Sequence, residues 1–515
     1  MSYIVEQEIK GNIYLYEVTS YWDKAMKQSR QKRKYIGRKK QNKKKKFLKD
    51  AEIIHKKYGN VFLLQQITQK LGLDKILEQV FPDDFKDILS LSFFSICNNS
   101  ALYTYPLWLD EHQLPDAKKL HSPDVSALCQ LIGRKQKSVY DFFNLWTAKC
   151  QSYSSVYFDI TSISSYANDI DFIEWGYNRD HEQLPQLNIG LFCSEDTELP
   201  IYYHIYPGSI SDVSTLKNGL KYLHSFGLND IMLILDRGFC SKKNILQMNE
   251  CDSMTFIQPM TFSMKKVSEI IRTNRKKLKD IASAIKFKEE ILHYVSTDFT
   301  LENEIFTAHL FYNEKAEIDQ RHNLLSMLFD IENTFTKDIF ETQKEYMDYR
   351  NENIPEKYQD FFKYNRSKKS IERNDRKLKS YLLRSGYFIF LSNNKKLNKY
   401  SILQHYRKRD IVEKMFDIEK NHMDSKRLRC HGEASANGRI FIKFIALITY
   451  SYIMHNMKDK QLFNKYSVKE LLAILSKIRQ TFINGEQIIS EVSKAQREIL
   501  NEFDITPEMI SEHSY

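Results

Sequence analysis

The sequence predicts an α/β protein whose core is a mixed β-sheet with helices on both faces. Short apolar runs separated by turns begin at Ser155, and amphipathic segments with a helical period lie between the later runs. Their order is strand, strand, strand, helix, strand, helix, strand. Strands that follow one another in this way pair into one sheet, and the intervening helices cover its faces.

Each element of this core has its own signal. Runs of alternating or continuous apolar residues predict strands, and residues that repeat with a helical period predict helices. We expect strands in 154–161, 186–193, 200–207, 230–239 and 254–258, and helices in 213–226 and 242–249. This order of elements is that of a ribonuclease H-like core.

Two acidic residues stand where neighbouring strands of this core end. The first strand ends in Asp159, and the fourth delivers Asp236 to its carboxyl end. Because these strands are neighbours in the predicted order, we expect the two carboxylates to lie side by side. Carboxylates that close repel each other unless a cation lies between them.

A third acid lies on a predicted helix, Ser401–Asn421, which contains no Gly or Pro. At about 100° per residue, Tyr406, Arg409, Glu413 and Lys420 project from one narrow stripe of this helix. Ile411, Met415 and Ile418 point the opposite way and predict a buried face. The stripe therefore presents a carboxylate beside three groups that suit phosphate.

Taken alone, each of these acids would be read as a turn residue, a helix cap or a solvated surface group. Together, Asp159, Asp236 and Glu413 predict an oxygen-rich site of the kind that suits Mg²⁺ or Mn²⁺. Two ions about 3.5–4 Å apart would activate an attacking hydroxyl and stabilise the leaving oxygen of a phosphodiester displacement.

Positive charge is concentrated near the N-terminus. The formal net charge is +11, and fourteen Lys and Arg residues stand against a single acid between Asp23 and Lys49. A solvated linker and an arm that neutralises DNA phosphates both fit this composition. The candidate contacts in this stretch are Arg30, Lys32, Arg33, Lys34, Arg38, Lys39 and Lys40.

The remaining patterns divide the chain into six regions. We expect a β-ribbon with the basic arm in 1–50, a helical domain for DNA binding or dimerisation in 51–150, and the first core part in 151–258. An insertion follows in 259–385, mixed in structure, with strands at 293–300 and 304–312 and a helical, basic portion after residue 314. Residues 386–393 should return the chain to the sheet edge within a second core part, 386–460, and 461–515 should form a helical tail.

Several classes of protein are disfavoured. The seven cysteines are widely spaced without a CxxC, which favours a reducing cytoplasm over a disulfide framework. No signal peptide is indicated, and the apolar stretch Ile440–Met454 is interrupted by Lys443 and too short to span a membrane. No GxxxxGK[ST] run occurs, so no nucleotide cofactor is expected.

These motifs resemble those of the bacterial insertion-sequence DDE transposases of the IS-four superfamily. The spacing Tyr406-x2-Arg409-x3-Glu413-x6-Lys420 matches the Tyr-Arg-Glu-Lys signature of that superfamily, and YFDITS and LDRGFCSKKNI resemble the surroundings of its two aspartates. The run Gly176–Gly190 and the segment GRIFIKFIALI resemble its long-transposase branch, as does the opening ribbon. The resemblance is strongest in 155–250 and 386–450.

The resemblance implies an enzyme that binds the terminal inverted repeats of its element, hydrolyses phosphodiester bonds with divalent metal and joins 3′-hydroxyl ends to target DNA. It places the metal at Asp159, Asp236 and Glu413, and it implies a homodimer on paired ends. Tyr406, Arg409 and Lys420 would hold terminal phosphates, and Arg179 and Arg237 are further candidates for DNA contact. Trp175 is either a core residue or the aromatic that stacks on a flipped base.

Two other functions remain open. A degenerate or domesticated descendant would bind DNA without cutting it, and a metal-dependent nuclease would cleave without strand transfer. The presence of all three acids together with the phosphate stripe favours the active transposase.

Overall fold

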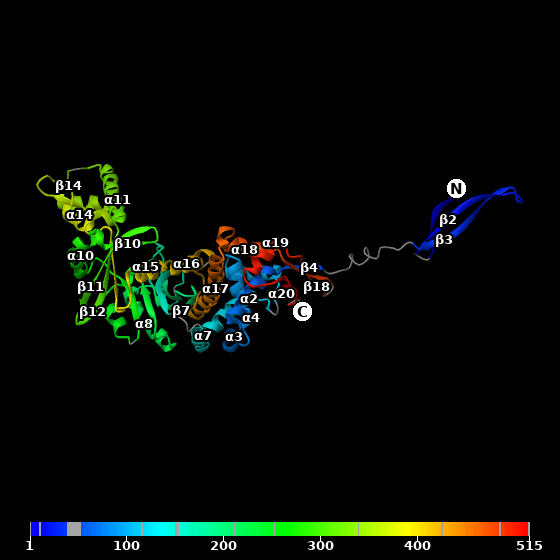
Figure 1. The fold of residues 1–515 in the computed structure, drawn as a ribbon, viewed down its shortest axis with the longest axis horizontal. Helices are drawn as coiled ribbons and strands as arrows, with labels where there is room; N and C mark the ends of the chain where they lie inside the picture. The colour runs from blue at the N-terminus through cyan, green and yellow to red at the C-terminus, as the bar shows by residue number, and fades with distance from the viewer. Residues whose placement is uncertain are drawn as a thin grey trace.

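The computed structural model describes residues 2–9, 12–38, 53–114, 117–149, 154–167, 169–180, 182–210, 212–251, 253–337, 339–423, 426–483 and 486–512. Its centre is a large mixed sheet flanked by helices (Figure 1).

The predicted core sheet is present. Strands β5 (Ser155–Ser165), β6 (Gln186–Ser194) and β7 (Pro200–Pro207) pair antiparallel, and β5, β8 (Met232–Leu235) and β9 (Thr255–Pro259) pair parallel. Helix α8 (Asp212–Ser225) connects β7 to β8, and helix α9 (Lys242–Asn249) connects β8 to β9. The order β7-β6-β5-β8-β9 is that of a ribonuclease H-like core, as the sequence predicts. The strand β5 does not end at Asp159 but continues to Ser165, because β6 pairs with it along that whole length.

The sheet extends well beyond this core. Strand β15 (Tyr387–Ser392) pairs with β9, and β12 (Glu304–Tyr312), β11 (Glu290–Leu301) and β10 (Ala284–Phe287) follow outward. We expected β15 at the sheet edge. It lies inside the sheet instead, since the strands of the insertion add to its outer side with antiparallel hydrogen bonds.

The insertion is mixed, as predicted, but part of its helical portion is a hairpin. Its helices are α10 (Lys265–Leu278), α11 (Glu314–Asn333), α12 (Gln343–Asn353), α13 (Glu356–Gln359) and α14 (Asp375–Leu382). The basic segment after α13 forms the pair β13 (Phe362–Asn365) and β14 (Ser370–Arg373), with Lys369 at positive φ in the turn. A residue in that left-handed conformation ends a helix and favours a tight turn.

A helical layer packs on the other end of the core. It contains α2 (Gly59–Leu71), α3 (Leu73–Val80), α4 (Phe85–Cys97), α5 (Tyr105–Glu111), α6 (Ser122–Arg134), α7 (Gln136–Lys149) and the long α17 (Glu433–Asp459). The backbones of helices α6 and α17 are in contact at Gly438. A Cβ atom at this position would lie 1.9 Å from the Cys129 carbonyl oxygen, so the close packing requires glycine. Among the described residues α17 is the one helix long and apolar enough to cross a membrane, and 72% of its most apolar window is buried inside the protein.

The C-terminal segment returns to the start of the helical layer. We expected helices alone after residue 461. The structure has α18 (Val468–Leu475), α19 (Lys494–Asn501) and α20 (Pro507–Glu512), but also strands β17 (Arg479–Ile483) and β18 (Glu486–Ile489). Strand β17 pairs with β4 (Ile53–Lys57), so a partner strand remote in sequence converts this stretch into sheet.

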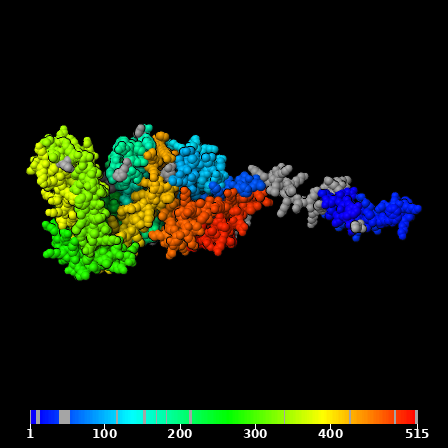
Figure 2. Space-filling view, turned by 90° about the horizontal axis from the view of Figure 1, so that it is seen from above, coloured from blue at the N-terminus to red at the C-terminus, as the bar shows by residue number. Residues whose placement is uncertain are grey.

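The N-terminal strands form a separate three-stranded sheet, β1 (Ser2–Ile9), β2 (Asn12–Asp23) and β3 (Gln28–Arg38). In Figures 1 and 2 this sheet lies at one end of the molecule and the insertion at the other. The first basic residues therefore belong to a strand. Lys39 and Lys40 lie outside the described residues.

Candidate active site

The segment that carries the third acid is not one continuous α-helix. It consists of α15 (Lys399–Arg407), α16 (Asp410–Asp417) and the π-helical segment η4 (Ile418–His422). Between α15 and α16 the backbone bonds tighten, since the amides of Ile411 and Val412 reach back only three residues. The predicted buried face is confirmed, as Ile411, Met415 and Ile418 are buried.

The sheet brings the two aspartates together as predicted. In the parallel pairing of β5 with β8, Phe158 is the partner of Leu235. Asp159 and Asp236 each follow one of these partners, so they occupy equivalent positions on neighbouring strands. Helix α16 packs against this part of the sheet, and the Met415 sulfur lies 3.0 Å from that of Cys193 on β6. This contact packs the buried face of α16, opposite the face that carries Glu413, onto the sheet.

All three acids converge on the guanidinium of Arg409. Its Nη1 atom lies 3.2 Å from Asp236 and 3.6 Å from Asp159, and its Nη2 atom lies 2.5 Å from Glu413. The Arg409 side chain is only 16% exposed, whereas that of Glu413 is 57% exposed. One cation therefore binds three carboxylates from remote parts of the chain, with Glu413 at the open rim.

The three acids supply the chemistry of a magnesium or manganese site, because carboxylate oxygens are the ligands that these hard cations prefer. The described residues contain no group of three acids, histidines or cysteines already spaced to hold a metal ion. The Arg409 guanidinium occupies the space among the three carboxylates. As a donor set, three carboxylates fit a divalent cation.

Asp159 lies deepest in this cluster. Its pKa is raised to about 6, chiefly by burial and also by the neighbouring Asp236. The amide of Ile160, which donates a 2.8 Å hydrogen bond to Asp159, and the charge of Arg409 oppose this rise. The carboxylate thus relies on nearby positive charge to stay ionised at neutral pH.

The other two members of the signature stripe have partners of their own. Tyr406 packs on Phe390 of β15 with 4.6 Å between ring centroids, and Arg409 lies over the Tyr406 ring. Lys420 is largely buried and pairs with Asp180 at 2.6 Å. Tyr406, Arg409 and Glu413 therefore form one contiguous group, while Lys420 is tied to the loop before β6.

That loop is held rigidly against the sheet. Gly176 approaches the Gly208 carbonyl so closely that a Cβ atom would lie 2.0 Å from it. The side chain of Asn178 donates to Ser164, and Arg427 pairs with Glu182 at 3.1 Å. Backbone contact and polar bonds thus explain why the run from Gly176 to Gly190 has its particular sequence.

Aromatic side chains project from the same loop. Trp175 is 68% exposed, so the structure does not place it in the core, and Tyr177 and Tyr166 are exposed as well. Arg427 lies over the ring of Tyr166. Of the two predicted arginines, Arg237 is exposed directly after Asp236, while Arg179 is half-buried with Ser162 3.5 Å from its guanidinium.

A buried carboxylate that we did not predict anchors the signature segment. Glu195, in the turn after β6, has a side chain only 4% exposed and accepts a 2.6 Å hydrogen bond from His405. Lys408 also pairs with it, at 3.3 Å. Burial alone would raise the pKa of Glu195, but the contacts with His405 and Lys408 outweigh burial and hold the pKa below its usual value. In the sequence, Glu195 and Asp196 indicated a turn between two strands and gave no sign of this anchoring role.

The basic residues of β3 divide between the two faces of the N-terminal sheet. Arg30, Lys32 and Lys34 lie opposite Tyr21, Thr19 and Glu17 of β2, so they share one exposed face. Arg33 and Arg38 lie on the other face with Tyr35. The predicted contacts therefore include a regular stripe of three cations.

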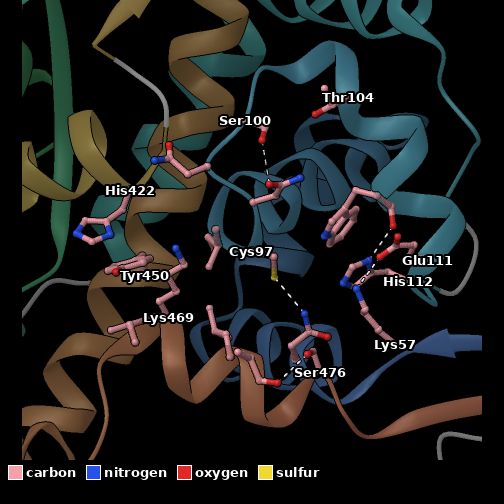
Figure 3. A pocket seen from close by; sticks show the side chains of 18 of the residues that line it. Lys57, Cys97, Ser100, Thr104, Glu111, His112, His422, Tyr450, Lys469 and Ser476 are labelled. Carbon is pink, nitrogen blue, oxygen red and sulfur yellow. Dashed lines mark hydrogen bonds and ion pairs between the residues drawn. The ribbon is translucent and has the colours of Figure 1, made fainter.

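A polar cavity of about 770 Å³ borders the far end of the signature segment (Figure 3). Asn421 and His422, which follow Lys420, line it together with residues of α4, α5 and α18. In its wall His112 stacks on Trp108, and burial lowers the pKa of His112 to about 4. None of the three acids lines this cavity, so it is distinct from the acid cluster.

The sheet order and the convergence of three acids define a ribonuclease H-like nuclease or transferase. Residues 151–449 match the model of the transposase DDE domain family, which covers more than half of the chain. The protein belongs to this family, whose members are metal-dependent enzymes that cleave and join DNA.

A solved structure of piggyBac transposase, in a synaptic complex with hairpin DNA, is similar with a TM-score of 0.34 and 10% identity over 88% of this chain and 75% of that chain. A comparison with curated proteins finds no match.

Proposed function

We propose that the protein is the transposase of a bacterial insertion sequence, acting in the cytoplasm as a homodimer on paired ends. It binds the terminal inverted repeats of its element, cleaves phosphodiester bonds there and joins 3′-hydroxyl ends to target DNA. The observation that carries the proposal is the shared contact of Asp159, Asp236 and Glu413 with one cation. The Tyr-Arg-Glu-Lys spacing supports the bacterial branch.

The three carboxylates would hold two Mg²⁺ or Mn²⁺ ions. When bound, such ions activate the attacking oxygen and stabilise the leaving oxygen of an in-line displacement. Asp159 and Asp236 fix the floor of this site, since neighbouring strands hold them in register. Glu413 completes it from the exposed rim.

The neighbouring side chains would position the DNA strand. The planar guanidinium of Arg409 suits bidentate phosphate binding, and Tyr406 and Lys420 would contact adjacent phosphates. Lys420 would exchange Asp180 for phosphate. The exposed ring of Trp175 offers a surface on which an unpaired base can stack. The cationic stripe of β3 would bind duplex DNA outside the cleavage site.

The central test changes Asp236 to Asn and Glu413 to Gln in separate variants. Each should reduce Mg²⁺-dependent cleavage of an end-containing duplex at least about a thousandfold, because a ligand charge is lost, while DNA binding remains measurable. Asp410→Asn is the matched control, since Asp410 lies on the same helix and pairs with Lys414 on the surface. Unchanged cleavage in the Asp236 variant would refute the assignment.

Two assays separate the alternatives. A steep salt dependence of binding without any nicking in Mn²⁺ would indicate a protein that only binds DNA. Cleavage without joining of labelled 3′-hydroxyl ends to a plasmid would indicate a nuclease.

A further inference from the structure

The position of Arg409 is unusual for a residue expected to hold phosphate. Its guanidinium contacts Asp159, Asp236 and Glu413 at once, so any other anion would have to compete with three carboxylates for it. The space among the three carboxylates is also where a divalent cation would have to bind. The Arg409 side chain therefore blocks the divalent cation, and the three acids keep it from a phosphate.

We propose that Arg409 is an exchangeable internal cation that couples metal binding to DNA binding in this site. Without DNA its guanidinium contacts all three acids, offsets part of their negative charge and competes with metal. A DNA phosphate that captures the guanidinium opens the acids to divalent cations. This inference rests on the proposed function, because it assumes that the acids bind metal and that Arg409 meets phosphate.

The position of Arg409 allows its guanidinium to leave the acid cluster toward solvent. Arg409 lies at the short turn between α15 and α16, and the contact with Glu413 lies at the exposed rim of the cluster. The ring of Tyr406, 5.8 Å from the guanidinium, provides a surface beneath the side chain. Rotation of the side chain alone therefore brings the group toward solvent while the backbone stays in place.

Electrostatics make the two events interdependent. If the guanidinium left alone, the three carboxylates would lose the cation that contacts all of them and would repel one another, which is unfavourable. Its departure is favourable when a phosphate receives it and a divalent cation replaces it. Such coupling is reciprocal, so DNA should tighten metal binding by the same factor by which metal tightens DNA binding.

The test measures Mn²⁺ binding by electron paramagnetic resonance on the full chain, with and without a saturating 30-base-pair linear duplex. Without DNA, Arg409→Gln should bind Mn²⁺ roughly tenfold more tightly than the wild type, since close charge pairs contribute at least this much. Arg407→Gln is the matched control. Arg407 lies two residues before Arg409 and carries the same charge, but it pairs with Glu290. This variant should leave Mn²⁺ affinity unchanged.

The duplex should tighten Mn²⁺ binding roughly tenfold in the wild type and not in Arg409→Gln. Equal Mn²⁺ affinity of the two proteins without DNA, or an equal effect of DNA on both, would overturn the inference. Asp236→Asn separates this failure from that of the proposed function. If that variant binds Mn²⁺ as the wild type does, the acids are not the metal site and the function itself fails.

A folding measurement accompanies the titration. In EDTA, Arg409→Gln should unfold at a lower temperature than the wild type, and Mn²⁺ should raise its unfolding temperature by more. Arg409→Lys keeps the charge but cannot bridge three acids, so its Mn²⁺ affinity should lie between those of the other two. A lysine variant identical to the wild type in this respect would argue against the exchange.

Discussion

The acid cluster and the N-terminal sheet both concentrate charge, but they treat it in opposite ways. At the cluster every charge has a partner, because Arg409 contacts all three carboxylates. On β3, Lys32 and Lys34 are exposed, and among the described residues they form no ion pair. Compensated charge fixes geometry for chemistry, whereas uncompensated charge attracts a polyanion without fixing it.

The largest expected effect removes the cationic stripe of β3, in which Arg30 pairs with Asp23 at 3.5 Å while Lys32 and Lys34 form no ion pair among the described residues. Replacing Arg30, Lys32 and Lys34 together by Gln should weaken DNA binding by about a hundredfold to a thousandfold at low salt and reduce the salt slope by about three. Fluorescence anisotropy across a salt series measures both quantities. The cleavage rate at saturating DNA should stay within about twofold of the wild type, since these side chains lie outside the acid cluster. A large loss of that rate would break the proposed division of roles.

The next prediction concerns a carboxylate buried in the core. Glu419 in η4 is buried, which raises its pKa to about 7, and the charges of Lys420 and Lys443 offset this only in part. The folded state therefore keeps a proton that the unfolded chain releases above its ordinary pKa. Stability should be greatest below pH 4.5 as far as this group is concerned, and it should fall between pH 4.5 and about 7 by on the order of 3 kcal/mol.

Glu419→Gln tests this directly by denaturant unfolding at several pH values. The variant should lack this part of the pH dependence and be more stable than the wild type at pH 8. Tyr203 of β7 also faces Glu419, so Tyr203→Phe serves as a control that removes a neighbouring hydroxyl and leaves the carboxylate. Equal pH slopes for wild type and Glu419→Gln would show that the carboxylate is ionised when folded.

The sequence predicted the core and its acids well because both are encoded locally. Periodicity identified each strand from β5 to β9, and the topology of such a core places Asp159 beside Asp236. What failed depended on partners remote in sequence. The pairing of β17 with β4, and the addition of β12 to β15, have no local signal. The tightened turn at Arg409 was equally hidden, since no Gly or Pro marks it.

Glu195 provides a test of the acid cluster, where charged groups have partners. Its carboxylate binds His405 and Lys408 and so fixes the segment that leads into Arg409. Glu195→Gln should lower the cleavage rate at saturating DNA about tenfold, because misplacement of a positioned group is costly, while DNA affinity changes little. Asp196→Asn, one residue along in the exposed turn, is the control. If Glu195→Asp restores part of the cleavage rate, the carboxylate positions the segment by its charge. If Glu195→Gln loses DNA affinity as strongly as cleavage rate, the positioning role is wrong.

The smallest effect is expected where exposed cations already have partners. In the insertion hairpin Lys368 pairs with Glu372, Lys369 pairs with Glu341, and Arg366 donates to Gln343. Replacing these three by Gln removes as much positive charge as the change on β3. Because carboxylates neutralise the charges of Lys368 and Lys369, and Arg366 alone bonds to a neutral amide, DNA affinity should fall by no more than about threefold and the salt slope by less than one. A loss as large as that of the β3 variant would mean that DNA reads the total charge and not its compensation.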